Sequence, residues 1–353
     1  MSSNDLLIRV EGRIGRLTMN RPAALNALTY PMVGALTAAL QLWAADPAID
    51  FVILDGAGGR ALCAGGDVLS LYHAHAQGPA FARSFWREEY HLNALIGRYP
   101  KPFVAIMDGI VMGGGIGLSG HASHRVVTEK SMLAMPETSI GLIPDVGGTW
   151  LLSQASGELG TYLGLTGARM NAADAMTADF ADVCIHTSSI GDLVAKLGTT
   201  VADDIDGELF ARAGDAGAAK LRDIRAEIDA TFSHDRVEDI IASLEANPSD
   251  FATRTLRDLT SKSPKALKFT LAALRYARQQ TSLEACLNME FRLVTRLYDD
   301  GEFIEGVRAL LIDKDKAPKW QPATLADVTD EMVMRYLAPL PPDQELGLSA
   351  PVA

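Results

Sequence analysis

At residues 51–67 the chain carries FVILDGAGGRALCAGGD, and at residues 103–115 it carries FVAIMDGIVMGGG. Both stretches begin with a short apolar run, which is typical of a buried strand, and continue through Asp-Gly towards a glycine-rich turn. The residues after each turn can form a helix. The chain therefore contains two units in which a glycine turn follows a strand and lies at a helix N-terminus.

The segments before these units predict two strands and a helix. Alternating runs at residues 6–10 and 13–18, separated by Gly12, predict a hairpin. Apolar residues then recur at helical spacing over residues 32–43. We therefore expect strand, strand and helix as the repeating unit of the first half of the chain.

From about residue 200 the pattern changes to helices. Residues 282–298 place Leu283, Leu287 and Val294 on one apolar stripe, as in an amphipathic helix. The end of the chain, 336–353, contains four prolines and few periodic apolar residues, so we expect it to be extended or mobile. We expect three parts: a catalytic core at 1–200, a helical region at 201–335 and a tail at 336–353.

The composition excludes several classes of protein. Of the 353 residues, 48% are hydrophobic and 22% are charged, and no apolar run reaches the length of about 18 residues that a bilayer span needs. We therefore expect a soluble, globular chain. The net charge of −12 argues against a broad nucleic-acid-binding face, which needs clustered Lys and Arg. The N-terminal residues show no secretory or transit signal, so we expect a cytoplasmic location.

The cysteines do not indicate cross-links or a metal site. Cys63, Cys184 and Cys286 are far apart in the chain and lack C-x-x-C spacing. We expect neither a disulfide nor bound zinc.

The two glycine turns are candidates for an oxyanion hole. Backbone N–H groups at a helix start have no helical partner, and two such turns that converge would stabilise the negative oxygen of an enolate or tetrahedral intermediate. The alternative is that the glycines only allow tight turns and close packing. The first turn matches neither the GxGxxG pattern nor the phosphate-binding loop that requires a Lys.

Residues 135–148 contain a pair of candidate acid/base groups. Glu137 and Asp145 each lie beside a proline and among apolar residues. Burial would raise the pKa of such carboxyl groups and suit them to proton transfer. Alternatively they are turn and cap residues, with Asp145 capping a helix that begins just after it.

Glu89 is a third candidate. It shares helical spacing with Phe85, Leu92 and Ile96, which places it on an apolar face. A carboxylate directed inward needs a partner or a function. A ligand-facing role and a structural ion pair with a core Arg or Lys both remain open.

Taken together, these segments resemble the enoyl-CoA hydratase/isomerase (crotonase) superfamily. The matching segments occur in the family's order over roughly the first 180 residues: LTMNRP at 17–22, LNAL at 25–28, RALCAGGD at 60–67, KPFVA at 101–105, Gly109, MGGG at 112–115, and 136–148 from PE to Gly148. The resemblance implies an α/β fold, a spiral of repeated strand-strand-helix units, followed by a C-terminal helical region.

The resemblance also implies a role for the glycine turns. The N–H groups of Gly66 and Gly114 would bind the oxygen of an acyl-CoA thioester. The remaining residues that the resemblance assigns to substrate binding in these turns are Gly65, Asp67, Gly113 and Gly117.

One position departs from the hydratases of this family. They use two glutamates, one three residues after the middle glycine of the triple-glycine turn and one 20 residues later. In this chain those positions hold Gly117 and Glu137. A lone glutamate does not supply the paired acid and base that add water to a double bond. Asp145, REEY at 87–90 and EGVRALLIDKDKAPKW at 305–320 instead resemble the 3-hydroxyisobutyryl-CoA hydrolase branch, over nearly the whole chain.

This branch implies hydrolysis of a short 3-hydroxyacyl-CoA, 3-hydroxyisobutyryl-CoA in valine breakdown. Glu137 would act as general base on water or attack the thioester directly to give an anhydride. Asp145 would orient water or shuttle a proton, and Glu89 would accept the substrate's hydroxyl. Two alternatives are an enoyl-CoA hydratase or isomerase that works with Glu137 alone, and a non-enzymatic CoA-binding or scaffolding protein.

The resemblance leaves the CoA phosphates without an assigned partner. Many relatives carry a basic residue directly after Arg-Pro, whereas this chain has Ala23. Arg21, Arg60 and Lys101 are the candidate cations. No cofactor other than the CoA of the substrate, no metal, and no nucleic-acid or membrane partner is implied, and a homo-oligomer stays open.

Overall fold

The computed structural model describes residues 4–200 and 202–350. They form two compact units that are interleaved along the chain. Of the described residues, unit 1 comprises 4–66, 91–134, 169–200 and 202–222, and unit 2 comprises 67–90, 135–168 and 223–350. The units do not follow the sequence-predicted boundary at residue 200, because residues 67–90 and 135–168 pack with the C-terminal helices.

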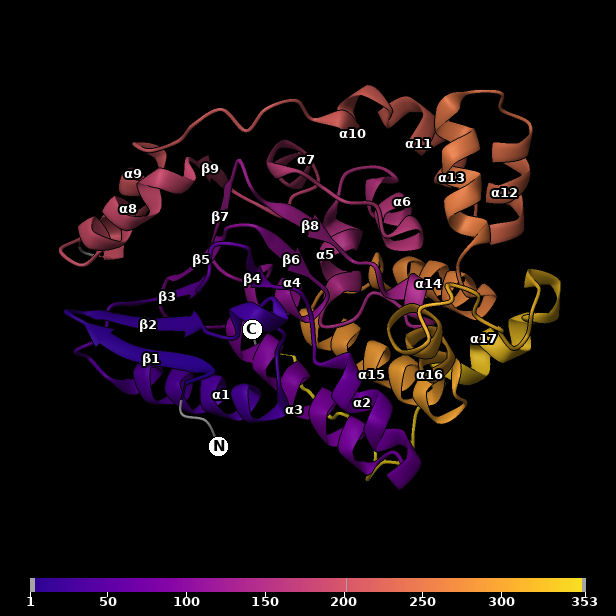
Figure 1. Ribbon diagram of the computed structural model, residues 1–353, viewed down its shortest axis with the longest axis horizontal. Helices are drawn as coiled ribbons and strands as arrows, with labels where there is room; N and C mark the ends of the chain where they lie inside the picture. Colours follow the sequence, from indigo (N-terminus) through magenta and orange to yellow (C-terminus); the bar gives the residue numbers. More distant parts are fainter. Residues whose placement is uncertain (1–3, 201, 351–353) are drawn as a thin grey trace. The chain divides into compact units, whose positions relative to one another are not determined.

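Unit 1 is built on a six-stranded sheet with the order β1-β2-β3-β5-β7-β9 (Figure 1). The predicted hairpin is confirmed, since β1 and β2 pair antiparallel. The later strands pair in parallel. The bounds are β1 Leu6–Glu11, β2 Ile14–Met19, β3 Phe51–Gly56, β5 Phe103–Met107, β7 His124–Thr128 and β9 Val183–Ile185.

A second, three-stranded parallel sheet in unit 1 has the order β4-β6-β8. Its strands are β4 Ala61–Cys63, β6 Ile110–Met112 and β8 Met132–Ala134. The chain places one strand in the large sheet and the next in the small sheet, three times in succession. This repetition is the predicted crotonase-like spiral.

Helices of unit 1 cover the large sheet. Ile53, Ile106 and Val126 form a buried cluster with Leu193 of α8 and Leu209 of α9. The predicted helix at 32–43 is α1, and a Cβ at Gly15 of β2 would lie only 2.3 Å from the ring of Trp43, so α1 packs directly on the strand. The helices are α1 Tyr30–Ala45, α4 Gly114–Ser119, α7 Ala172–Thr177, α8 Ile190–Leu197 and α9 Ile205–Phe210.

Unit 2 consists of helices, and α3 and α10 each run across a boundary between the units. The predicted amphipathic helix is confirmed as α15, which Ser282 caps by accepting the N–H of Ala285. The helices are α2 Val68–Ala74, α3 Ala80–Gly97, α5 Gly148–Gln154, α6 Leu159–Thr166, α10 Lys220–Asp223, α11 Arg225–Phe232, α12 Val237–Glu245, α13 Asp250–Thr260, α14 Pro264–Ala277, α15 Leu283–Asp299, α16 Glu302–Val307 and α17 Asp330–Leu337.

The tail after α17 is anchored within unit 2. Residues 338–350 form no helix or strand. The Arg87 guanidinium donates to the carbonyls of Gln344 and Glu345, Arg292 pairs with the Glu345 carboxylate, and Leu346 is buried. These contacts hold the extended segment against α3 and α15. Residues 351–353 of the predicted tail lie outside the described residues.

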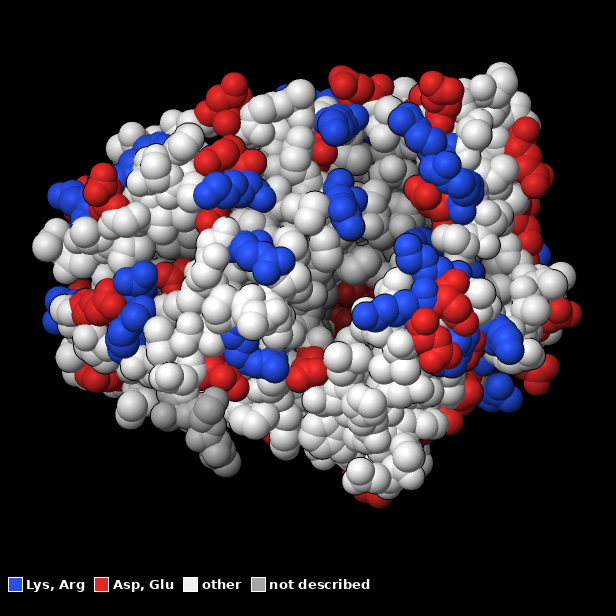
Figure 2. Space-filling view, viewed as in Figure 1, with Lys and Arg blue, Asp and Glu red and all other residues white. Residues whose placement is uncertain are grey.

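The surface carries both signs of charge. On the face in Figure 2, basic and acidic side chains are interspersed over the described residues. No described helix combines the length and apolar character that a bilayer span requires. Cys63, Cys184 and Cys286 are buried and form no disulfide among the described residues, which also contain no cluster of three or more His, Cys, Asp or Glu suited to a metal ion.

Candidate functional site

The two glycine turns of unit 1 have the same local design. In each, a glycine with positive φ precedes the candidate donor: Gly65 (φ 120°) precedes Gly66, and Gly113 (φ 49°) precedes Gly114. Gly114 is the first residue of α4, where an N–H has no helical partner. Neither Gly66 nor Gly114 donates its N–H to another of the described residues. Both groups are therefore available as donors.

The two turns lie next to one another. A Cβ at Gly115 would lie 2.1 Å from the carbonyl oxygen of Cys63, and one at Gly65 would lie 3.5 Å from that of Met112. Only glycine at position 115 allows α4 to approach the end of β4 so closely. The sequence left two roles open for these glycines, close packing and an oxyanion hole. In the structure the close packing of the two turns is compatible with a shared donor site.

Gly117 lies in the middle of α4. Every residue of this helix is buried, and the Gly117 N–H donates to the Gly113 carbonyl at 3.1 Å. A glycine at this position leaves α4 without a carboxyl group. The sequence-predicted absence of the hydratase carboxylate therefore applies to the whole helix.

The acidic residues belong to unit 2. Glu137 begins the short 3-10 helix η3 (Glu137–Ile140) and is 5% exposed, and Asp145 is 6% exposed. Helix α16 holds η3 in place: a Cβ at Gly306 would lie 2.4 Å from the backbone of Ile140. Side chains and backbone therefore fix the segment that carries Glu137.

Asp145 is not a helix cap. Helix α5 begins at Gly148 with Gly147 as its N-cap and has no side-chain cap. Instead, the Tyr90 hydroxyl donates to Asp145 Oδ2 at 2.6 Å. The capping alternative is wrong for the Asp145 carboxylate, because positive φ angles at Val146 (54°) and Gly147 (78°) separate it from the helix start.

Burial shifts the titration of this pair. It raises the pKa of Asp145 to about 6, an effect that the Tyr90 hydrogen bond opposes. Burial raises the pKa of Glu137 well above its ordinary range, and the negative charge of Asp145 raises it further. Glu137 Oε2 has no hydrogen-bond partner among the described residues. Both carboxyl groups therefore hold their protons to higher pH than exposed ones do, which suits them to proton transfer.

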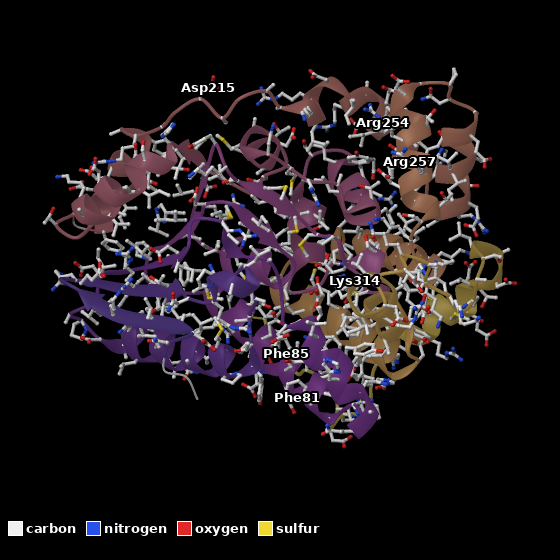
Figure 3. The ribbon with its side chains drawn as sticks, viewed as in Figure 1. Phe81, Phe85, Asp215, Arg254, Arg257 and Lys314 are labelled. Carbon is white, nitrogen blue, oxygen red and sulfur yellow. The ribbon has the colours of Figure 1, made fainter. Side chains whose placement is uncertain are left out.

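Glu89 faces the same cluster from α3. Figure 3 shows Phe81 and Phe85 on successive turns of this helix; Phe81 is 37% exposed, whereas Phe85 and Glu89 are each 2% exposed. Burial and then the charge of Asp145 raise the pKa of Glu89 well above its ordinary range. Glu89 forms no ion pair with a Lys or Arg among the described residues, and Oε1 has no partner. The predicted inward direction is confirmed, and the structural ion pair is wrong.

Sequence reasoning missed two members of the cluster, Tyr90 and Glu290. Glu290 accepts the N–H groups of Gly147 at 2.7 Å and Thr149 at 3.0 Å, and the Thr149 hydroxyl also donates to it. Burial raises the pKa of Glu290 to about 8. A signal was present, because Glu290 lies three residues after Leu287 on the apolar stripe of α15.

Several predicted residues have structural partners. Asp67 caps α2 by accepting the Ser70 N–H at 3.2 Å. Lys101, a candidate for the CoA phosphates, donates to the Trp43 and Asp46 carbonyls at the end of α1, which is a favourable place for a cation. Arg21 donates to the Ala27 carbonyl at 2.7 Å. Arg60 is exposed and has no ion pair among the described residues.

Two segments suggested the hydrolase branch, and only some of their residues belong to the acidic cluster. The others make structural contacts. In REEY at 87–90, Arg87 anchors the tail, whereas Glu89 and Tyr90 face Asp145. In 305–320, Arg308 pairs with Glu305, Asp313 and Asp315. This second segment is helical up to Ile312 and irregular after it, and its ion pairs are separate from the acidic cluster.

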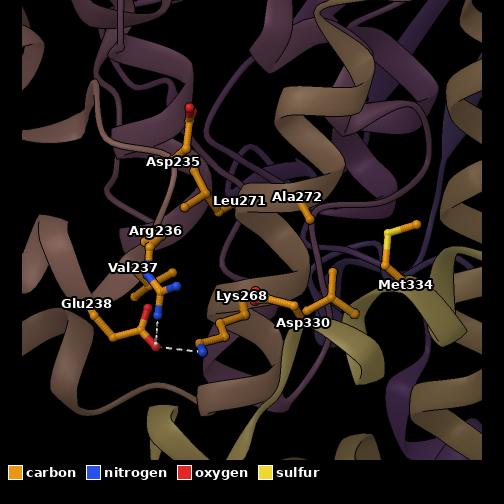
Figure 4. A pocket seen from close by; sticks show the side chains of 10 residues that line it. Asp235, Arg236, Val237, Glu238, Lys268, Leu271, Ala272, Asp330 and Met334 are labelled. Atoms are coloured by element: carbon orange, nitrogen blue, oxygen red, sulfur yellow. Dashed lines mark ion pairs between the residues drawn. The ribbon is translucent and has the colours of Figure 1, made fainter.

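A cavity elsewhere in unit 2 contains none of the predicted residues. It has a volume of about 230 Å³ and lies among α12, α14 and α17. Lys268 and Arg236 both pair with Glu238 at its edge (Figure 4). The charges there compensate one another, unlike those of the acidic cluster.

Comparison with known proteins agrees with the fold. A family profile described as enoyl-CoA hydratase/isomerase matches residues 14–337. The chain belongs to this family. It is 42% identical to the mitochondrial 3-hydroxyisobutyryl-CoA hydrolase of Xenopus laevis over 337 residues, which cover 93% of this chain and 87% of that protein. The predicted family membership is confirmed.

Solved structures of the family have the same fold. A carnitinyl-CoA dehydratase from Mycobacterium thermoresistibile is 46% identical, with a TM-score of 0.91 over 97% of this chain and 98% of that one. An enoyl-CoA hydratase from Rhodobacter sphaeroides is 43% identical, with a TM-score of 0.92 over 98% and 100% of the two chains. The chain is thus an acyl-CoA enzyme of the crotonase family, with the predicted α/β fold and C-terminal helical region.

Proposed function

We propose that the protein hydrolyses the thioester of a short 3-hydroxyacyl-CoA, with 3-hydroxyisobutyryl-CoA of valine breakdown as the substrate. The observation that carries the proposal is the buried pair of Glu137 and Asp145, whose pKa values burial raises, combined with a glycine at position 117. Similarity to hydrolases with this activity over nearly the whole chain supports it.

In the proposed reaction the N–H groups of Gly66 and Gly114 bind the thioester oxygen. These donors stabilise the negative charge that develops when the carbonyl is attacked. Glu137 takes a proton from water as the water oxygen bonds to the carbonyl carbon, the C–S bond breaks, and the CoA sulfur receives a proton. In the alternative route the Glu137 carboxylate attacks the carbonyl carbon, the C–S bond breaks and CoA leaves as a thiol after taking a proton. Water then hydrolyses the anhydride, which releases the acid and restores the Glu137 carboxylate.

The remaining acidic groups have supporting roles in this proposal. Asp145 orients water or passes a proton, because its carboxylate is held by the Tyr90 hydroxyl and its pKa of about 6 lies within the working range of a base. Glu89 accepts a hydrogen bond from the 3-hydroxyl group of the acyl chain. A buried carboxyl oxygen without a partner disfavours an acyl group that lacks the hydroxyl.

A hydratase or dehydratase is the second candidate, since the two similar solved structures carry those names at 46% and 43% identity. Either activity needs an acid and a base that act at the two carbons of the double bond. Helix α4 supplies no carboxyl group, so this candidate requires that Glu137 work with Asp145 or Glu89 instead.

One pair of assays separates these functions. Purified protein is given 3-hydroxyisobutyryl-CoA and then crotonyl-CoA, with free thiol and loss of the conjugated double bond recorded for each. We expect thiol release from the first substrate and little change in the second. Hydration of crotonyl-CoA faster than thiol release would overturn the hydrolase proposal, and neither signal would favour a non-enzymatic CoA-binding protein.

A further inference from the structure

Glu290 is a fully buried carboxyl group that the proposed reaction does not use. It lies on α15 and is 0% exposed. Its two oxygens together accept three hydrogen bonds, from the N–H groups of Gly147 and Thr149 and from the Thr149 hydroxyl. All three donors belong to the segment that directly follows Asp145.

This segment has a backbone that needs to be held. Val146 is a β-branched residue with φ of 54°, in the left-handed region that such residues rarely adopt. Gly147 follows with φ of 78°, and the Gly148 N–H turns back to the Asp145 carbonyl at 2.6 Å. Surrounding contacts must maintain such a conformation, and the contacts to Glu290 span it from Gly147 to Thr149.

The same turn of α15 also supports the partner of Asp145. Phe291, the residue after Glu290, packs edge-on against the Tyr90 ring with centroids 6.1 Å apart. Tyr90 in turn donates its hydroxyl to Asp145. One helical turn therefore contacts both the backbone that carries Asp145 and the group that orients its carboxylate.

We propose that Glu290 is a positioning residue for Asp145. The inference rests on the proposed hydrolase function, because it assigns Glu290 to the chemistry that Asp145 assists. Glu290 does not contact the substrate. It keeps the 145–149 turn in the conformation that presents the Asp145 carboxylate to Tyr90 and to the reacting water.

The first test is a double-mutant cycle measured with 3-hydroxyisobutyryl-CoA. Glu290→Gln should lower kcat by about 10- to 100-fold and change KM by less than about threefold. In an Asp145→Asn background the same change should lower kcat by less than about twofold, because its effect passes through Asp145. Equal losses in both backgrounds would overturn the proposal.

Two matched controls separate positioning from general stability. Glu284→Gln alters another buried glutamate of α15, six residues earlier and on a different face of the helix, and should keep kcat per folded molecule. Thr149→Val removes only one donor to Glu290 and should lower kcat by about 3- to 10-fold, whereas Thr149→Ser keeps the hydroxyl and should restore it. A kcat that is the same for Thr149→Val and wild type would contradict the proposal.

A readout independent of turnover distinguishes failure of this inference from failure of the proposed function. Amide hydrogen exchange of the peptide spanning 145–152 should be at least about tenfold faster in Glu290→Gln than in wild type or Glu284→Gln, since the glutamine NH2 group replaces one of the two acceptor oxygens and cannot accept a hydrogen bond. Unchanged exchange would overturn the positioning role. If exchange accelerates in a protein without thioesterase activity, the hydrolase proposal fails and the structural link to Asp145 stands.

Discussion

Four carboxyl groups, those of Glu89, Glu137, Asp145 and Glu290, are buried in unit 2 without an ion pair to Lys or Arg among the described residues. Burial is the largest cause of the raised pKa of each. Uncompensated carboxyl groups are costly in a protein interior. The acidic cluster therefore differs from the charges around Arg308, where each carboxylate pairs with the guanidinium.

Glu137 is the group whose loss should affect chemistry most. Glu137→Gln keeps the shape of the side chain and removes the base, so we expect turnover to fall by about 10²- to 10⁴-fold while binding of the CoA ester is retained. Thiol release and ligand titration on one preparation measure the two effects. Hydrolysis at a near wild-type rate in this variant would remove Glu137 from the mechanism.

Coupling between Asp145 and Glu137 has a predictable sign. The negative charge of Asp145 raises the pKa of Glu137, so Asp145→Asn should lower that pKa and move the acidic limb of kcat/KM to lower pH. Tyr90→Phe should act in the other direction on Asp145, because the hydroxyl hydrogen bond lowers the pKa of that group. Acidic limbs that do not move in either variant would contradict the coupling.

At the scale of elements, α4 combines two expectations in six residues. Its first residue, Gly114, presents an N–H without a helical partner, and its fourth, Gly117, lacks the carboxyl group of the hydratases. Helix α4 therefore contributes the Gly114 N–H group and no carboxyl group.

The donor role of Gly114 is testable by proline substitution. Proline removes the N–H and is tolerated at the first position of a helix. Gly114→Pro should lower turnover by at least about 10²-fold, corrected for the fraction of folded protein measured by circular dichroism. A folded variant with wild-type turnover would rule out this N–H as an oxyanion donor.

Gly117→Glu tests whether the missing carboxyl group sets the reaction type. Hydration of crotonyl-CoA should rise from near zero, since a second acid/base group is restored on α4. Hydrolysis should fall, because α4 is buried throughout and a glutamate side chain at position 117 takes up space that the glycine leaves open. Both activities are measured on the same folded preparation. A loss of hydrolysis without gained hydration would favour a purely steric role for glycine.

At the scale of the whole molecule, the buried carboxyl groups link stability to pH. Folded-state pKa values of about 6 for Asp145 and about 8 for Glu290 lie above the value of about 4 in an unfolded chain. Between these limits the folded state binds more protons, so the free energy of unfolding falls as pH rises from about 4 to 8.

Denaturant unfolding at pH 5, 6, 7 and 8 measures this dependence. We expect lower stability at pH 8 than at pH 5, and a smaller decrease between pH 6 and 8 in Glu290→Gln. The variant serves as the control for general repulsion in a chain with a net charge of −12. Stability that rises over this range in wild type would contradict the raised pKa values.

The local sequence pattern was sufficient to predict an element or the direction of a side chain wherever these follow from the neighbouring residues in sequence. Hydrophobic periodicity predicted β3, β5, α1 and α15, and helical spacing alone showed that Glu89 points inward, because both periods follow from the geometry of a single element. The sequence analysis did not predict the short strands β4 and β6, which lie between a predicted strand and its glycine turn. Three residues are too few to show a period, and pairing within the small sheet makes them strands.

Contacts between distant segments decided the rest. Asp145 had a local interpretation as a helix cap, and its partner, Tyr90, lies 55 residues away. Glu290 lies 143 residues from Gly147. No pattern within one element encodes such pairs, because their distances depend on how α3, α5 and α15 pack in unit 2. The amino-acid pattern therefore set the elements and the family, whereas tertiary packing chose the partners of each buried carboxyl group, and hence its pKa.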